Sequence, residues 1–330
     1  MTRWTRLLGV AAAVAAAFST ASPALAGERE VSRQISFGGS CKNCELAGRN
    51  LSNAKILGAN FSGANLVGAS LRDARLYASN FAGANLTKAD LRDSAINGSN
   101  FSGANLTSAS LKSADAKGVS FNGATLSLAD LSDAEATGTA FRGAIMIATV
   151  LRAATMRGVS FEKADLSRAE MRDIKASGAN FSGARVVDAS FRSAGLKGAN
   201  FSRSDALGAS FRDADLVGAF LTAGEFGRAS FRSADLTGAN LTNARFDGAD
   251  FRDADLSRTG LTGTDLSNAV GLTQNQIDDA CSGTGTRLPR GLVPRGCAGT
   301  RNRNYPDYRI PPVPPAPPAA PAPIPTSARR

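Results

Sequence analysis

The chain has 330 residues, carries 38 Lys and Arg against 28 Asp and Glu, and has a formal net charge of +10. It contains no histidine, which excludes nucleophiles activated by histidine and metal sites built on histidine. These features favour a protein that is not an enzyme and that carries no cofactor and no metal.

Residues 1–26 have the pattern of a cleavable secretory signal. Arg3 and Arg6 give a positive start, residues 7–18 form an apolar run, and Ala24-Leu25-Ala26 is a typical cleavage site. The apolar run is too short to span a bilayer, which argues against the alternative of a membrane anchor. No later segment is apolar enough to be a transmembrane segment. The sequence therefore predicts a mature chain that starts at Gly27 and is periplasmic or secreted.

A five-residue period runs from Leu46 to Leu266, with an apolar residue or alanine at every fifth position, here called the centre of each unit. In the unit Ala64-Asn65-Leu66-Val67-Gly68 the centre is Leu66, and a small residue stands two positions before it. A period of five fits neither an α-helix nor a β-strand. It predicts a repeat architecture with a narrow core, in which neighbouring units bury one another.

A second, longer period lies over the first and is marked by phenylalanines at every fourth centre. One series is Phe61, Phe81, Phe101, Phe121, Phe141, Phe161, Phe181 and Phe201, and another is Phe191, Phe211, Phe231 and Phe251. The period predicts four units per coil, so that each core phenylalanine lies over its equivalent in the next coil. With the β-ladder spacing of about 4.8 Å, the coils form a rod roughly 55 Å long.

Short runs such as Ala239-Asn240-Leu241 and Ala254-Asp255-Leu256 resemble the repeats of the pentapeptide-repeat family. The resemblance implies an all-β fold, a right-handed quadrilateral parallel β-helix, over residues 46–270. It fixes shape better than function, because members of the family have diverse roles. Some members imitate DNA and bind DNA gyrase, an activity linked to quinolone resistance.

The segments on either side of the repeat are expected to cap its two ends. Residues 27–45 are predicted to form the N-terminal cap and residues 271–300 the C-terminal cap. In the latter, Thr273 and Gln276 have capping-box spacing, which predicts a short helix from about Gln274 to Cys281. Residues 301–330 form a basic, proline-rich tail that is predicted to be a disordered spacer. The alternative for the tail is a ligand or wall-spanning segment.

Four cysteines in an exported chain indicate disulfides. Cys41 and Cys44 precede the predicted first coil, whereas Cys281 and Cys297 follow the last. Because the rod is far longer than the Cα separation of about 5–6 Å in a disulfide, pairing must be local. We expect Cys281 to pair with Cys297, and Cys41 either to pair with Cys44 or to stay unpaired. The C-x-x-C spacing also leaves open a redox or metal site, although the context of a thioredoxin site is missing.

One side of the predicted coil carries a column of basic residues directly after the centre position. The column consists of Arg72, Arg92, Lys112, Arg152, Arg172, Arg192, Arg212, Arg232 and Arg252 and is interrupted by Ser132. Aspartates such as Asp73 and Asp213 recur beside it. The arginines are the candidate binding face for an anionic partner. The alternative is a solvated face whose internal ion pairs deter strand pairing, and the interleaved aspartates favour that alternative.

The leading hypothesis is a non-catalytic exported scaffold that presents flat β-helix faces to a protein or polymer of the cell envelope. A gyrase-binding DNA mimic is the alternative, but mimicry requires a strongly acidic rod. Residues 46–270 instead hold 25 Lys and Arg against 22 Asp and Glu. A third hypothesis is binding of nucleic acid or an anionic surface through the basic tail, and scarce exposed aromatic residues disfavour nucleic acid. A homodimer is also left open.

Overall fold

Each five-residue unit forms one side of a coil and ends in a tight turn. In the unit around Phe61, the amide of Ala64 donates to the carbonyl oxygen of Phe61 at 3.0 Å, and Gly63 between them has φ +65°. Such a left-handed residue suits Gly, Asn and Asp, which explains why these types recur two positions after the centre. The structure is a computed structural model that describes residues 36–37 and 39–296.

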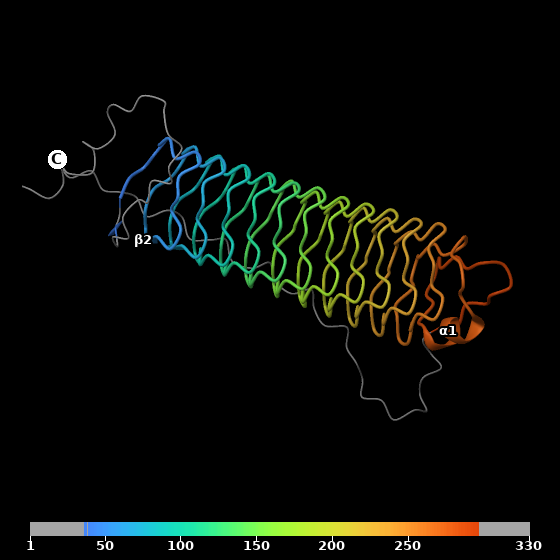
Figure 1. Cartoon of the computed structure of the whole chain (residues 1–330). Coiled ribbons are helices and arrows are strands. Elements are labelled where there is room, and N and C mark those ends of the chain that lie inside the picture. The colour runs from blue at the N-terminus through green and yellow to red at the C-terminus, as the bar shows by residue number, and fades with distance from the viewer. Residues whose placement is uncertain (1–35, 38, 297–330) are drawn as a thin grey trace, which may run out of the picture.

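Successive coils stack through parallel backbone pairing between residues that lie four units apart in the sequence. Asn60 pairs with Asn80, for example, and the amide of Phe61 donates to the carbonyl oxygen of Asn80 at 2.7 Å. This register repeats from one coil to the next and produces the rod of stacked coils in Figure 1. Four units therefore make one coil, and the prediction of a right-handed quadrilateral parallel β-helix is confirmed.

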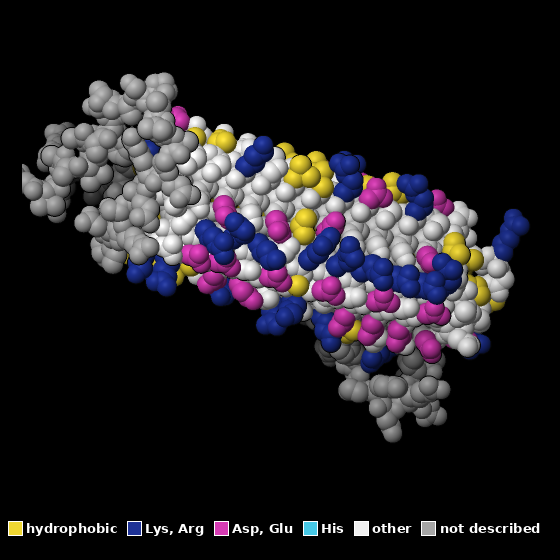
Figure 2. All heavy atoms as spheres, viewed as in Figure 1, with side chains coloured by type: hydrophobic (Ala, Val, Ile, Leu, Met, Phe, Trp, Pro, Cys, Tyr) yellow, Lys and Arg dark blue, Asp and Glu magenta, His cyan; other side chains and the backbone are white. Residues whose placement is uncertain are grey.

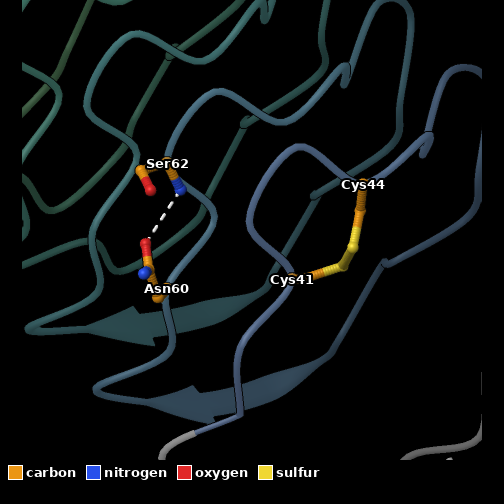
Figure 3. The surroundings of a disulfide bond; sticks show 4 residues. All are labelled: Cys41, Cys44, Asn60 and Ser62. Carbon is orange, nitrogen blue, oxygen red and sulfur yellow. Dashed lines mark hydrogen bonds between the residues drawn. A yellow bond between two sulfur atoms is a disulfide. The ribbon is translucent and has the colours of Figure 1, made fainter. Parts of the chain in front are cut away.

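Extended strands are short because each side of the coil contributes few residues to pairing. The named strands are β1 (Ser36–Phe37), β2 (Lys55–Leu57) and β3 (Arg75–Tyr77), which form a parallel sheet in the order β1-β2-β3. Elsewhere in the described part of the chain the pairing is reduced to single-residue bridges. A side-chain turn stabilises many units as well. In the unit shown in Figure 3, the Asn60 Oδ1 accepts from the amide of Ser62 at 3.0 Å.

The core is a column of stacked side chains along the rod axis. The structure buries all eight phenylalanines of the first series, from Phe61 to Phe201. Their rings are stacked coil on coil, with centroid distances from 4.5 to 5.2 Å. The second series runs beside the first from Phe191, whose ring stands at 88° to that of Phe181. Where the two series overlap, smaller centres such as Ala206 make room.

The coil begins earlier than Leu46. Ser40 pairs with Asn60 and Glu45 pairs with Asn65, so the ladder extends into the segment that was expected to be a cap. Cys41 stands one full coil before Phe61 and donates its amide to the carbonyl oxygen of Asn60 at 2.7 Å. The prediction that Cys41 and Cys44 precede the first coil is therefore corrected. Both occupy inward positions of that coil, the centre and the small position.

The two cysteines of the first coil are joined by a disulfide, with a Cα–Cα distance of 5.2 Å (Figure 3). Both are partly buried and pack against the core. The disulfide therefore links two inward positions of the first coil covalently, whereas inward positions farther along the rod are held by the packing of leucine and phenylalanine side chains.

A short helix, α1 (Gln274–Asp279), covers the C-terminal end of the rod (Figure 1). The predicted capping box is present, because Thr273 and Gln276 satisfy each other's backbone amides. The helix ends two residues before the predicted Cys281. Gln276 also donates through Nε2 to the carbonyl oxygens of Phe251 and Ala254, at 3.0 and 2.8 Å. The carbonyl oxygen of Ala254 thereby gains a partner in place of the next coil's amide, whereas that of Phe251 also accepts from the amide of Ala254 at 3.1 Å.

After α1 the chain returns to the ladder, where Cys281 pairs with Gly260 and Arg287 pairs with Asp265. These two pairs are wider in sequence than the regular register, by one and two positions. The segment with α1 adds the first extra position, and the second lies between Cys281 and Arg287. The predicted signal (1–26), Cys297 and the tail (301–330) lie outside the described residues. The pairing of Cys281 with Cys297 therefore stays a prediction.

Candidate binding face

The structure brings the eight candidate arginines together in one column along one side of the rod. Each stands one residue after a buried centre, so the core fixes their spacing. The last four arginines of the column each follow a phenylalanine. The centroids of successive phenylalanine rings are 4.9 Å (Phe191–Phe211), 5.0 Å (Phe211–Phe231) and 5.1 Å (Phe231–Phe251) apart. Successive guanidinium groups therefore start from backbone positions about one ladder spacing apart. Figure 2 shows rows of basic and acidic side chains running along the rod.

Three of the arginines are held by hydrogen bonds to carboxylates. Arg92 donates to Asp90 through Nε at 2.8 Å and through Nη2 at 2.5 Å. Arg252 makes the same pair of contacts with Asp250, at 2.9 and 2.5 Å. Arg152 donates to Glu170 of the next coil, through Nε at 2.6 Å. The donors of these guanidinium groups are thus partly occupied within the protein.

The hydrogen bonds of Arg92 and Arg252 change the titration of their partners. The side-chain hydrogen bond from Arg92 holds the pKa of Asp90 below its ordinary value, and Arg252 lowers the pKa of Asp250 in the same way. Both aspartates are therefore ionised at neutral pH. Each also accepts from the backbone amide of its arginine, at 3.1 Å, so the turn and the ion pair support each other.

The other five arginines have only looser ion pairs. The N–O distances are 3.5 Å for Arg72 with Asp73, 3.9 Å for Arg172 with Glu170, 3.8 Å for Arg192 with Asp213, 3.5 Å for Arg212 with Asp213, and 3.9 Å for Arg232 with Asp253. For the last three arginines, the sequence explains why the ion pairs are loose. Two residues before Arg192, Arg212 and Arg232 stands a serine, whereas an aspartate precedes Arg92 and Arg252 at that position.

The cysteines add no second site. Cys41 and Cys44 are bonded to each other inside the first coil. Within residues 36–37 and 39–296, no group of three or more His, Cys, Asp or Glu side chains is placed to hold a metal ion. The same part of the chain contains no helix that is long and apolar enough to cross a membrane.

The comparison with known families agrees with this geometry. The sequence model for pentapeptide repeats matches repeatedly, over residues 40–83, 57–93, 84–123, 109–146, 146–183, 184–222 and 225–270. The chain belongs to the pentapeptide-repeat family. No match to a curated protein was found.

Solved structures of pentapeptide-repeat proteins are similar to the chain. HetL of the cyanobacterium Nostoc sp. strain PCC 7120, involved in the regulation of heterocyst differentiation, is 28% identical; the match covers 69% of this chain and 89% of HetL, with a TM-score of 0.29. A protein of the Arabidopsis thaliana thylakoid lumen is 33% identical over 36% of this chain and 87% of its own, with a TM-score of 0.33. Full-length QnrB1, a plasmid-mediated fluoroquinolone resistance protein, is 20% identical over 68% and 92%, with a TM-score of 0.24.

Proposed function

We propose that this chain is a non-catalytic, exported scaffold that binds a protein or polymer of the cell envelope through a flat face of its β-helix. The observation that supports the proposal most is the arginine column. From Arg152 to Arg252, six consecutive coils each hold one half-exposed arginine of this column over a buried core residue. Such a face offers a partner a long row of fixed charges rather than an enclosed pocket for a small molecule.

Export is supported by two separate features of the chain. Residues 1–26 have the composition and cleavage pattern of a secretory signal. The disulfide between Cys41 and Cys44 fits an oxidising compartment such as the periplasm or the extracellular space.

The proposal is tested by fractionation and by capture. The full chain is expected in the periplasmic or secreted fraction, and a variant without residues 1–26 in the cytoplasm. The exported protein and a variant that ends at Arg301 then serve as baits in an envelope extract. A partner held by both baits places binding on the rod, and a partner lost with the tail places it on residues 302–330. Cytoplasmic location, loss of the partner with the tail, or capture of nothing above background would overturn the proposal.

The gyrase-binding alternative is not favoured by the charges of the rod. DNA mimicry needs a strongly acidic surface, whereas residues 46–270 carry slightly more basic than acidic side chains. The likeness to QnrB1, at 20% identity, shows the fold alone. Loss of gyrase supercoiling on addition of the purified chain would reinstate this alternative.

A further inference from the structure

Three consecutive arginines on the candidate binding face, Arg192, Arg212 and Arg232, differ from the hydrogen-bonded arginines of the same column. We propose that this trio binds the carboxylates of a linear acidic polysaccharide, a polyuronate, with about one sugar residue per coil and the polymer lying along the rod. This inference rests on the proposed function, since it names the partner class of the same face.

The first argument is the availability of hydrogen-bond donors. None of the three guanidinium groups donates a hydrogen bond to a side chain of the described residues, and their side chains are 48%, 42% and 38% exposed. The Nε of Arg212 is buried 3.5 Å from an oxygen of Asp213, so only the rest of this guanidinium group can be reached by a ligand. A carboxylate can accept two parallel hydrogen bonds from the planar fork of an arginine, which satisfies donors that the protein leaves open.

The second argument is the row of hydroxyl groups beside the arginines. Ser190 pairs with Ser210 and Ser210 with Ser230, so the three serines form a parallel row along the same coils. Their hydroxyl groups make no hydrogen bond within the described part of the chain, and the side chains are half-buried. Serine hydroxyls both donate and accept, which suits the hydroxyl groups of a sugar.

The third argument is the local charge. On this side of the three coils lie residues 190–193, 210–213 and 230–233. They include the three arginines and a single carboxylate, Asp213. That carboxylate is shared between Arg192 and Arg212, at 3.8 and 3.5 Å. Arg232 faces only the distant and largely exposed Asp253. The trio therefore keeps an excess of positive charge that is absent at Arg92 and Arg252, because each of these two is flanked by two aspartates.

The spacing selects the kind of polyanion. Coils recur at 4.9–5.0 Å behind the trio, which is close to the length of one linked sugar ring. Each strand of duplex DNA has one phosphate per about 3.4 Å of helix axis, and these phosphates wind around the axis, so they do not form a straight row with the period of the coils. Single-stranded nucleic acid prefers aromatic platforms, and Phe191, Phe211 and Phe231 between these side chains are buried.

The test uses the purified full chain and 1,4-linked oligogalacturonates of increasing length, with calorimetry at physiological salt. Binding should strengthen until an oligomer spans the trio. The variant Arg192→Gln/Arg212→Gln/Arg232→Gln should lose affinity by at least about tenfold, because it removes several charge-assisted hydrogen bonds. The matched control Arg142→Gln/Arg185→Gln/Arg245→Gln removes the same charge from arginines that lie outside the column and are paired with carboxylates, and it should lose much less.

Equal losses in the two triple variants would overturn the inference, because the effect would then be one of total charge. Binding of polyphosphate or DNA in preference to galacturonate, or no binding of galacturonate, would overturn it as well. The trio variant is also used as a bait in the envelope extract. A partner that it still captures leaves the proposed function intact while the polyuronate inference fails. Thermal unfolding of both variants checks that the rod is unchanged.

Discussion

The ring of Phe201 lies flat against that of Phe181, with centroids 4.5 Å apart, and at right angles to that of Phe191, at 5.5 Å. Phe201 thus lies where the two phenylalanine series run side by side, in contact with Phe191 and Phe211 of the second series. The neighbouring rings are held in place by the coils above and below. They therefore cannot move to fill the space that a smaller side chain at this position would leave.

Phe201→Ala should lower the free energy of unfolding by about 3–5 kcal/mol, because a fully buried ring leaves a cavity that stacked coils cannot close. Phe61→Ala is the matched control. Phe61 stacks on one ring only and is 7% exposed near the N-terminal end, so its loss should be smaller. Chemical denaturation measures both. Equal losses would contradict the register of the core.

The disulfide in the first coil should protect that end from local opening. In a Cys41→Ser/Cys44→Ser variant we expect faster hydrogen exchange of the amides of Cys41 and Leu46, which bond to the second coil. A disulfide that closes so short a loop should stabilise the folded state by about 2 kcal/mol through the lower entropy of the unfolded chain. The loss of this stabilisation should stay local to the first coil. Amides near Phe201 should exchange at the wild-type rate. A double variant is preferable to a reducing agent, which would also act on the predicted Cys281–Cys297 bond.

Stability should fall in acid partly through Asp90 and Asp250. Arginine hydrogen bonds lower the folded-state pKa of both groups. Their contribution is therefore complete above the ordinary aspartate pKa and is lost as pH falls through the folded values, below about pH 4. The variant Asp90→Asn/Asp250→Asn should show a flatter decline of melting temperature in that range. An unchanged acid profile would show that these ion pairs do not contribute.

The end of the rod should depend on Gln276 more than on its capping partner. Thr273→Ala removes one helix cap and should cost about 1 kcal/mol. Gln276→Glu keeps an acceptor for the amide of Thr273 but cannot donate to the carbonyl oxygens of Phe251 and Ala254. We expect it to destabilise the last coil by about 1–3 kcal/mol and to promote association of exposed edges. Melting curves and light scattering measure the two effects. A smaller loss than in Thr273→Ala would argue against this role.

The repetitive part of the fold could be predicted because every centre obeys the same period. The period of Phe61 to Phe201 fixes the number of units per coil, and the spacing of Thr273 and Gln276 predicts α1. The start of the coil was missed although a signal was present. Cys41 stands one full coil before Phe61 in the sequence, but a cysteine does not look like a repeat centre unless the register is extended backwards.

The candidate face could be predicted as a column but not as two groups of arginines. Arg152 bonds to Glu170, which is 18 residues away in sequence and adjacent only after the coils stack. For Arg92 and Arg212 a local signal exists in the residue two positions earlier, Asp90 or Ser210. Its meaning depends on the turn that brings this side chain beside the arginine, which the sequence pattern alone does not reveal.

The register of four units per coil also has a genetic consequence. A duplication or deletion of a block of four units would add or remove one whole coil and leave every other side chain on its own face. A change of a single unit would instead carry all later side chains a quarter turn around the axis, and would split the arginine column between two faces. Inheritance by whole coils thus allows the reach of the molecule to change while the chemistry of each face is kept.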